Sequence, residues 1–428
     1  MNKYEQYKKV DLPWLEEIPE HWELTRVKNL FKIHKDISYK NEPTVLSLTR
    51  KKVKVRDISN NQGQLADSYN NYNEVKKGDL LLNPMDLYSG PNCNISYYDG
   101  VISPAYINLR AFSKVSVKYY DYIFKLQYIS LAFQSVGKGV SLNNRWTISN
   151  ETLLKYSLPL PPLAEQEQIA AYLDWKINEI DRLIAVEKEK IVDIDKYVQN
   201  KISDQYKNLD KRRLKTVLKE SLLYGINSSG SEMGKIRFIR ITDIDKGGNL
   251  KNKKELYIDE CDSKYLLNKG DILLARSGAT VGKAYLHIND ENIMAFAGYL
   301  IRARVDQSII LPNYLYFYLL SNEYELWKEN IFIQSTIQNI SAEKYSNLRI
   351  PYVGKKKQIE IVSNVSKILR QKNNIMKSIN ETIDQLNSLK NSLISEVVTG
   401  RIDIRNVVIP SYEKVDIDIS TDEEEIEE

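Results

Sequence analysis

The sequence predicts an α+β fold in which two similar α/β domains are joined by two long antiparallel helices that form a coiled-coil spacer. Three observations predict this fold. They are an internal repeat at a spacing of 192 residues, the same order of β-type and helical segments in each half, and two long segments with a hydrophobic period of 3.5 residues. A duplicated unit with paired helices also predicts a pseudo-two-fold axis within the chain.

The repeat is carried by four pairs of similar segments, and the two members of each pair lie 192 residues apart. The pairs are KKGDLLL (76–82) with NKGDILL (268–274), ISNE (148–151) with ISAE (340–343), LP (158–159) with IP (350–351), and IS (202–203) with IS (394–395). A fifth pair, LSLT (46–49) with IRIT (239–242), is shifted by 193 residues. A single match can arise by chance, but four at one spacing indicate a duplication.

Each half begins with a domain of short β-type runs separated by turn residues, which we place at residues 1–160 and 208–352. The runs include GDLLLNP and SPAYINLRAF in the first half, and GDILLARSG and AFAGYLIRARV in the second. A helical stretch lies within each domain, at residues 115–134 and 311–329. Its aromatic and aliphatic residues have helical spacing and are expected to face the core.

A proline-containing boundary and then a long helix follow each domain, and we place the helices at residues 161–207 and 353–405. About 43 residues of helix span about 64 Å, and a narrow seam of that length is expected to pack against the other helix, antiparallel. The alternative is that each helix only covers its own domain. The second helix is expected to end at Gly400, in a left-handed cap. The seam residues are Leu173, Ile177, Ile180, Ile184, Glu187, Ile191, Ile194 and Val198 in the first helix, and Val362, Val365, Leu369, Lys372, Met376, Ile379, Ile383 and Leu386 in the second.

The distribution of charge favours a polyanion as ligand. The chain has 61 basic and 57 acidic residues, but eight of the acidic residues lie at positions 416–428, within a predicted acidic tail at residues 406–428. The remaining 61 basic and 49 acidic residues give the rest of the chain a formal charge of +12. The alternative is an ordinary globular protein with a solvated tail.

The sequence predicts no metal site, no cofactor and no membrane association. Its two cysteines and three histidines are scattered, which excludes a disulfide framework and a zinc site of ordinary spacing. The charged opening MNKYEQYKKV and the lack of any run of 18 apolar residues predict neither a signal peptide nor a transmembrane helix. We therefore expect a cytoplasmic protein.

Candidate DNA-binding residues lie in loops where the two halves differ. Lys and Arg neutralise phosphates, Arg can contact guanine through two hydrogen bonds, and Asn or Gln can do so with adenine. Each of these residues alone can also be an ordinary solvated surface residue. The candidates in the first half are Arg50, Lys51, Lys52, Lys54, Arg56, Tyr69, Asn71, Tyr72, Asn143, Asn144 and Arg145. Those in the second half are Arg240, Lys246, Asn249, Lys251, Arg276, Ser277, Lys283, Gln334, Gln338 and Asn339.

Motifs of catalysis are incomplete. The run GATVGKA (278–284) has three residues between its glycines instead of four and lacks the Ser or Thr that follows Lys in a phosphate-binding loop. The tetrad NPMD (83–86) lacks the second proline and the aromatic residue of the amino-methyltransferase signature, and no GxSxG motif is present. We expect a chain without catalytic residues.

Several segments resemble the type I restriction-modification specificity subunit, the HsdS family. They are YKKVDLPWLEEIPEHWELTRVKNLF, LPLPPLAEQEQIAAYLDWKINEIDRLIAVEKEKI, KKGDLLLNP with NKGDILLARSGATVGKAY, and LKNSLISEVVTGRIDIR. The resemblance spans about residues 7 to 405. One departure is the second junction, PYVGKKKQIEIV, which lacks the proline-proline-leucine and Glu-Gln pattern of the first.

The resemblance implies two target-recognition domains that each read one part of a split, asymmetric site in double-stranded DNA, held apart by the spacer helices. It also implies partners, namely two methyltransferase subunits and ATP-driven restriction subunits, with S-adenosylmethionine bound by the methyltransferase subunits. An alternative function is an assembly scaffold whose domains bind protein and not DNA. A solitary methyltransferase is a third, and it lacks the motifs it would need.

Overall fold

The computed structural model describes residues 2–37, 43–58, 68–85, 87–88, 90–139, 146–245, 247–251, 254–278, 281–288, 293–333 and 338–415. They form two compact units. Unit 1 consists of Met1–Glu187 and Glu381–Glu428, and unit 2 consists of Lys188–Asn380. Each unit contains one of the predicted β-rich segments together with part of each long helix.

Unit 1 contains a four-stranded antiparallel sheet with the strand order β4-β11-β8-β9. These strands are β4 (Phe31–Ile33), β11 (Ile107–Ala111), β8 (Leu80–Leu82) and β9 (Cys93–Ile95). The other strands pair two by two: β1 (Tyr7–Leu12) with β2 (Leu15–Pro19), β3 (Glu23–Arg26) with β12 (Ser157–Leu160), β5 (Leu46–Leu48) with β6 (Val53–Val55), and β7 (Asn73–Val75) with β10 (Gly100–Ile102). The helical elements are α1 (Val27–Leu30), α2 (Val117–Ile129), the 3-10 turn η1 (Ala132–Ser135) and α3 (Asn150–Lys155).

Unit 2 contains an equivalent four-stranded sheet, β14-β20-β17-β18. These strands are β14 (Leu223–Tyr224), β20 (Leu300–Ala303), β17 (Ile272–Ala275) and β18 (Ala284–Leu286). A second sheet contains β16 (Tyr257–Ile258), β15 (Ile236–Ile239) and β19 (Met294–Phe296), and β13 (Lys211–Arg213) pairs with β21 (Arg349–Pro351). The helical elements are α5 (Pro312–Tyr318), α6 (Asn322–Ile333), α7 (Ala342–Ser346) and the 3-10 turns η2 (Leu214–Val217), η3 (Ile241–Asp243) and η4 (Ser263–Tyr265).

The shared strand order confirms the internal repeat, and the structure explains its landmarks. The Lys-Gly-Asp segment precedes β8 and β17, and its glycine adopts a positive φ in both units, +96° at Gly78 and +92° at Gly270. The Ile-Ser segment provides a helix cap, because Ser149 accepts a hydrogen bond from Thr152 N (3.1 Å) and Ser341 accepts one from Lys344 N (3.2 Å). The repeat therefore preserves the residues that fix the backbone frame.

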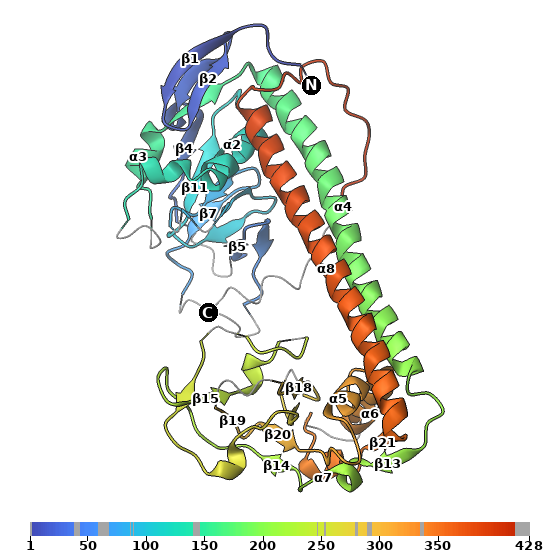
Figure 1. The fold of residues 1–428 in the computed structure, drawn as a ribbon. Coiled ribbons are helices and arrows are strands. Elements are labelled where there is room, and N and C mark those ends of the chain that lie inside the picture. Colours follow the sequence, from blue (N-terminus) through green and yellow to red (C-terminus); the bar gives the residue numbers. More distant parts are fainter. Residues whose placement is uncertain are drawn as a thin grey trace. The chain divides into compact units, whose positions relative to one another are not determined.

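The two long helices are α4 (Leu163–Asp204) and α8 (Lys355–Val398), and they lie side by side and antiparallel within each unit (Figure 1). In unit 1, the Lys390 ammonium lies 2.7 Å from the Asp181 carboxylate. In unit 2, Lys372 pairs with Asp195 at 2.6 Å and the Asn364 amide donates to Gln205 at 3.1 Å. The predicted pairing is thus confirmed, and the seam position Lys372 contributes an ion pair instead of an apolar contact.

One helix end agrees with the prediction, and one predicted helical stretch is divided. Gly400 has the expected left-handed φ of +75°, and a Cβ there would lie 2.6 Å from Pro19 Cδ, which leaves no room for a side chain. The helical stretch predicted at 311–329 is two helices, α5 and α6. The break between them is held by Asn322 N, which donates to the Ser203 hydroxyl at the end of α4 (2.8 Å).

Many of the 29 tyrosines are buried in the cores, and several use the hydroxyl to satisfy a backbone carbonyl. In unit 1, Tyr119 donates to Val398 O (2.9 Å) and Tyr120 to Pro159 O (3.1 Å). In unit 2, Tyr206 donates to Tyr314 O (2.9 Å) and Tyr345 to Ala275 O (2.9 Å). A tyrosine can therefore fill the core and also bond the backbone of irregular segments.

The two junctions make equivalent contacts although their sequences differ. The Gln166 side chain accepts from Ser116 N (3.0 Å) and donates to Pro161 O (2.8 Å). Gln358, 192 residues later, accepts from Leu311 N (2.9 Å) and donates to Ile309 O (3.0 Å) and Val353 O (2.8 Å). The departure seen in the second junction therefore spares a buried glutamine that ties each long helix to its domain.

We expect Gln358→Ala to lower the free energy of unfolding by about 1–3 kcal/mol, because it leaves buried backbone groups without their partner. Chemical denaturation of the full chain measures this loss. The matched control is Lys357→Ala, at the exposed neighbouring position, which is expected to change the stability by no more than about 0.5 kcal/mol. Equal effects of the two substitutions would contradict the role of Gln358.

Among the helices of the described residues, none has the length and apolar character that crossing a membrane requires.

Of the predicted acidic tail, residues 406–428, the structure describes residues 406–415. Part of this segment lies along α4. The Asn178 amide donates to Glu413 O (3.0 Å) and its carbonyl oxygen accepts from Val415 N (2.9 Å). The acidic residues 416–428 lie outside the described residues.

Candidate nucleic-acid interface

The basic run of unit 1 lies on a β-hairpin. Strands β5 and β6 pair with Leu48 opposite Val53, so residues 49–52 form the turn between them. The Thr49 hydroxyl accepts from Lys51 N (3.3 Å) and Lys52 N (3.1 Å), which fixes the turn through backbone groups. Arg50, Lys51 and Lys52 are exposed on this turn. The hairpin thus presents three cationic side chains on a rigid support.

The remaining unit 1 candidates follow this turn in the sequence. Lys54 is exposed on β6, and Arg56 just after it is half-buried. Tyr69 and Tyr72 pack edge to face with ring centroids 5.1 Å apart, and Asn71 between them is exposed. Asn143, Asn144 and Arg145 lie outside the described residues, as do Lys246 and Gln334 of the second half.

Arg240 of unit 2 is engaged within its own unit. Its guanidinium bonds the Asp243 carboxylate (2.8 Å from the closer nitrogen) and Lys254 O (3.1 Å). The pair closes the turn η3, since Arg240 N also donates to Asp243 (2.8 Å). Asn249 and Lys251 are exposed in the following loop, where Asn249 N donates to Asp245 (2.8 Å) and Lys251 N to Asp243 O (2.8 Å).

Four candidates of unit 2 come together at the end of β17. Ser277 forms an antiparallel bridge with Asn339, and Arg276 O accepts from Ile340 N (2.8 Å). Gln338, the neighbour of Asn339, is exposed. Residues from two segments more than 60 positions apart in the sequence thus meet at one edge of the sheet. Predicted residues that are distant in the sequence are thus neighbours at this place.

The described residues of the GATVGKA segment, Gly278 and residues 281–284, belong to the connection between β17 and β18. Gly282 N donates to Ala275 O (2.8 Å), and the chain continues into strand β18, whereas a phosphate-binding loop leads into a helix. Lys283 is half-buried in this loop.

Several relevant residues were missed by sequence reasoning. The ring of Tyr224 lies 5.0 Å from the Arg276 guanidinium carbon, and Tyr299, 63% exposed, accepts from Arg276 N through its backbone oxygen (3.0 Å). No sequence spacing connects these tyrosines to Arg276, because the contact depends on how β14, β17 and β20 pair.

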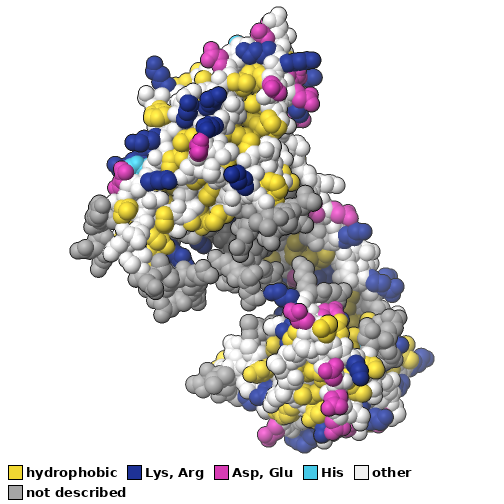
Figure 2. All heavy atoms as spheres, turned by 90° about the vertical axis from the view of Figure 1, so that its left-hand side faces the viewer, with side chains coloured by type: hydrophobic (Ala, Val, Ile, Leu, Met, Phe, Trp, Pro, Cys, Tyr) yellow, Lys and Arg dark blue, Asp and Glu magenta, His cyan; other side chains and the backbone are white. Residues whose placement is uncertain are grey.

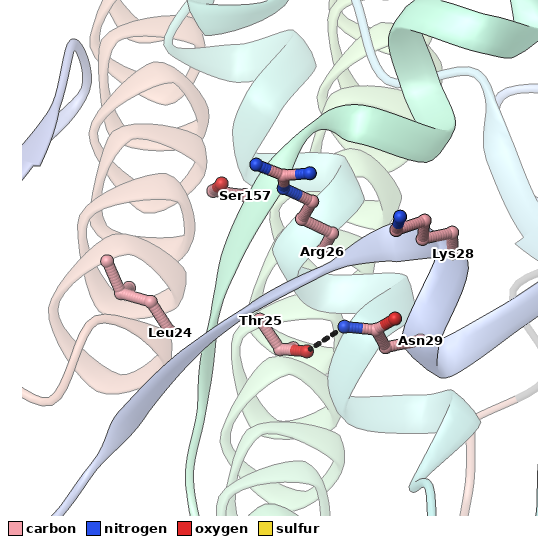
Figure 3. Close-up of a pocket in the computed structure, with 6 residues that line it drawn as sticks. All are labelled: Leu24, Thr25, Arg26, Lys28, Asn29 and Ser157. Atoms are coloured by element: carbon pink, nitrogen blue, oxygen red, sulfur yellow. Dashed lines mark hydrogen bonds between the residues drawn. The ribbon is translucent and has the colours of Figure 1, made fainter.

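A pair of exposed basic residues also recurs in the two units. In unit 1, Arg26 and Lys28 line an open polar pocket with Leu24, Thr25, Asn29 and Ser157 (Figure 3), where the Asn29 amide donates to Thr25 (3.2 Å). In unit 2, Arg213 and Lys215 hold the same place, because Leu214 N donates to Leu348 O (2.8 Å) as Val27 N does to Tyr156 O (3.0 Å). The signal was present in the sequence as TRVK (25–28) and RRLK (212–215).

Buried aspartates separate structural arginines from those on the surface. Asp79 bonds Arg110 through two pairs of atoms (2.8 and 2.7 Å), and this hydrogen bonding raises the pKa of Arg110. Asp271 does the same to Arg304 (2.7 Å for both pairs) and raises its pKa. Burial lowers the pKa of Arg302, which pairs with Glu220 (2.8 Å). These arginines support the sheets of the two units.

Positive charge is dispersed over the surface of unit 1. Figure 2 shows Lys and Arg side chains scattered over the visible face of this unit, among uncharged and hydrophobic ones. Among the described residues, no group of three or more His, Cys, Asp and Glu side chains is arranged to hold a metal ion.

Comparisons with known proteins relate the whole chain to one family. A family model described as "Type I restriction modification DNA specificity domain" matches residues 19–195 and 224–385, one match in each half. The chain is 24% identical over 384 residues to the type I restriction enzyme EcoBI specificity subunit of Escherichia coli, covering 82% of this chain and 79% of that one. It is 23% identical over 433 residues to the EcoKI specificity subunit of Escherichia coli strain K12, covering 90% of each.

A solved structure shares the fold. Described as "Structural basis underlying complex assembly and conformational transition of the type I R-M system", it matches with a TM-score of 0.64 at 17% identity, over 90% of this chain and 99% of that one.

Proposed function

This chain belongs to the family of type I restriction modification DNA specificity domains, and from that membership we propose that it binds double-stranded DNA and selects the sequence on which a type I restriction-modification complex acts. The observation that carries the proposal is the duplication itself. Two sheets with the same strand order hold different polar side chains at their edges. Two such frames in one chain suit a target made of two unlike parts.

The proposed target is bipartite and asymmetric, with unit 1 contacting one half-site and unit 2 the other. The exposed cations of the 49–52 turn are suited to phosphates, which give affinity without sequence preference. The grouping of Arg276, Ser277 and Asn339 is suited to base edges. The long antiparallel helices would serve as the spacer between the two readers.

We propose that the chain itself is not catalytic and works with partners. These would be methyltransferase subunits, two in number, which bind S-adenosylmethionine, and restriction subunits that translocate DNA. The chain would need no cofactor of its own and would act in the cytoplasm. Purified alone, it is expected to show neither methylation nor cleavage.

A protein-binding scaffold remains the second candidate, because the paired long helices alone could organise enzyme subunits. The two functions differ in their dependence on salt. Phosphate contacts release counterions, so the affinity for DNA falls steeply with salt concentration, whereas a scaffold would show no such affinity.

We expect the triple variant Arg50→Gln, Lys51→Gln and Lys52→Gln to make the dependence of DNA affinity on salt less steep. Each lost phosphate contact removes about 0.9 from the slope of log K against log salt, so the slope changes by about 2 to 3. The turn should survive, because the Thr49 hydroxyl that holds it bonds backbone groups of residues 51 and 52 and none of the replaced side chains. Fluorescence anisotropy with duplex DNA at several salt concentrations measures the slope.

The control removes three exposed charges elsewhere on unit 1, with Lys3→Gln, Lys9→Gln and Lys155→Gln. It is expected to leave the slope nearly unchanged. An equal change in both variants would place the effect in the overall charge and not in the hairpin. No salt-dependent binding of the unmodified chain would favour the scaffold.

A further inference from the structure

Arg276, one of the residues grouped with Ser277, Gln338 and Asn339 on the polar edge at the end of β17, is held in a fixed orientation and has no acidic partner among the described residues. Arg276 directly follows β17, and its backbone is bonded on both sides, from its N to Tyr299 O (3.0 Å) and from Ile340 N to its O (2.8 Å). Its guanidinium carbon lies 5.0 Å from the centroid of the Tyr224 ring. The Tyr224 hydroxyl accepts from Ala342 N (2.9 Å), which fixes the ring in turn.

Four other arginines of unit 2 form ion pairs with carboxylates of the same unit. Arg237 pairs with Glu255 (3.0 Å), Arg240 with Asp243 (2.8 Å), Arg302 with Glu220 (2.8 Å) and Arg304 with Asp271 (2.7 Å). Among the described residues, no carboxylate forms such a pair with Arg276. Its guanidinium is stacked and half-buried.

Two buried polar atoms at this place have no hydrogen-bond partner in the described part of the chain. They are Nε of Arg276 and the amide oxygen of Asn339. Buried polar atoms are nearly always bonded in the functional state of a protein, so a ligand or a small rearrangement on binding is expected to satisfy them. Arg276 and Asn339 lie on the two segments that the bridge between Ser277 and Asn339 joins.

The corresponding place in unit 1 shares one of these backbone hydrogen bonds and has different side chains. Ile148 N donates to Pro84 O (2.9 Å) just as Ile340 N donates to Arg276 O, so Pro84 is the counterpart of Arg276. In unit 1, Ile33 pairs with Leu109 of β11, and in unit 2, Leu223 pairs with Arg302 of β20. When β11 and β20 are aligned through their pairing with β8 and β17, the position equivalent to Tyr224 is Lys35, two residues beyond Ile33. A shared frame with exchanged side chains is expected where two halves read different bases.

We propose that Arg276 recognises a guanine in the half-site contacted by unit 2 and that Tyr224 is its positioning residue, an inference that rests on the proposed function. Guanine presents two acceptors, O6 and N7, at one edge, which match two guanidinium donors in a plane. A phosphate contact needs no such fixed plane and is usually made by mobile exposed cations. The stacking on Tyr224 therefore favours the base over the backbone of DNA.

The test is methylation mapping in cells that express this chain together with its methyltransferase subunits. The unmodified chain is expected to give a bipartite motif with a G·C pair in the half-site of unit 2. Arg276→Lys keeps the charge but loses the two-donor fork, so that pair should become degenerate, with discrimination falling about 5- to 150-fold. The other half-site should stay unchanged.

Two further variants separate positioning from folding. Tyr224→Leu removes the ring and should weaken discrimination at the same base pair, whereas Tyr224→Phe keeps the ring and should largely restore it. The matched control is Arg212→Lys, because Arg212 also stacks on a tyrosine, Tyr352 (3.6 Å), but on the β13–β21 ribbon. It is expected to leave the motif intact. Thermal unfolding of each full chain verifies that the variants are folded.

The outcomes separate the two levels of the proposal. An unchanged motif with Arg276→Lys, or a unit 2 half-site without a G·C pair, would overturn the inference and leave the proposed function standing. Methylation reduced equally at all sequences would make Arg276 a phosphate contact and also overturn it. An unmodified chain that directs methylation to no defined motif would overturn the proposed function itself.

Discussion

Replacement of Asp79 by alanine is expected to lower the free energy of unfolding by about 3–5 kcal/mol, the range for removing one partner of a buried ion pair. The Asp79 side chain is 3% exposed and accepts from four donors: Lys76 N (2.8 Å), Asn108 Nδ2 (3.0 Å), and Nε (2.8 Å) and Nη2 (2.7 Å) of Arg110. All four lose their acceptor in the variant. Urea denaturation of the full chain, followed by circular dichroism, measures the loss.

The repeat supplies a second copy of this prediction. Asp271 accepts from Asn268 N (2.8 Å) and from two nitrogens of Arg304 (2.7 Å each), so Asp271→Ala should destabilise unit 2 in the same way. Its effect is expected to be somewhat smaller, because Glu220 also contacts Arg304 (2.9 Å).

The control is Glu151→Ala, which removes an exposed carboxylate paired with exposed Lys155 and should leave the stability nearly unchanged. A loss below about 1 kcal/mol for Asp79→Ala would show that solvent or rearrangement replaces the pair.

These aspartates show what the sequence could and could not predict. The Gly-Asp landmarks were visible as a repeat because local backbone geometry demands them at fixed spacing. Their partners were not visible, since Arg110 and Arg304 follow 31 and 33 residues later and reach the aspartates only through strand pairing. The long helices were predictable for the opposite reason, because a 3.5-residue period is a local property.

The candidate DNA-binding residues divide in the same way. Residue type and loop context singled out positions such as Arg50 and Lys51, which are exposed in the structure. Arg240 was offered as a DNA contact, yet its guanidinium bonds an aspartate only three residues ahead, which the sequence RITD (240–243) displays. The stacking of Arg276 on Tyr224 joins residues 52 positions apart and could be found only in the folded chain.

Exchange of residues 208–352 for the equivalent domain of a relative is expected to change one half of the recognised motif and leave the other half intact. Each mismatched base pair costs about 1–3 kcal/mol, so a new half-site that differs at about three positions should shift the preference by about two to six orders of magnitude. Methylation mapping of cells that express the chimera with the methyltransferase subunits reads both halves at once.

The structure favours these exchange points because the foreign domain would be held through backbone atoms. The ends of the exchanged segment lie side by side, where Tyr352 N donates to Asp210 O (2.7 Å) and β13 pairs with β21. From the retained helices, Gln358 bonds Leu311 N and Ile309 O, and the Tyr206 hydroxyl bonds Tyr314 O. Every foreign domain offers backbone N–H and C=O groups, whatever its side chains are. These hydrogen bonds to the retained helices therefore do not depend on the DNA sequence that the domain recognises.

The donor protein, mapped in the same cells, supplies the half-site that the chimera should acquire, and the unmodified chain supplies the half-site that it should keep. A chimera that reads neither, although it unfolds as cooperatively as the parent chain, would mean that the two units determine the target jointly. A change in both halves would mean the same. Retention of both original half-sites would place recognition outside residues 208–352. It would also exclude the role assigned to the polar edge of β17, which lies within that segment.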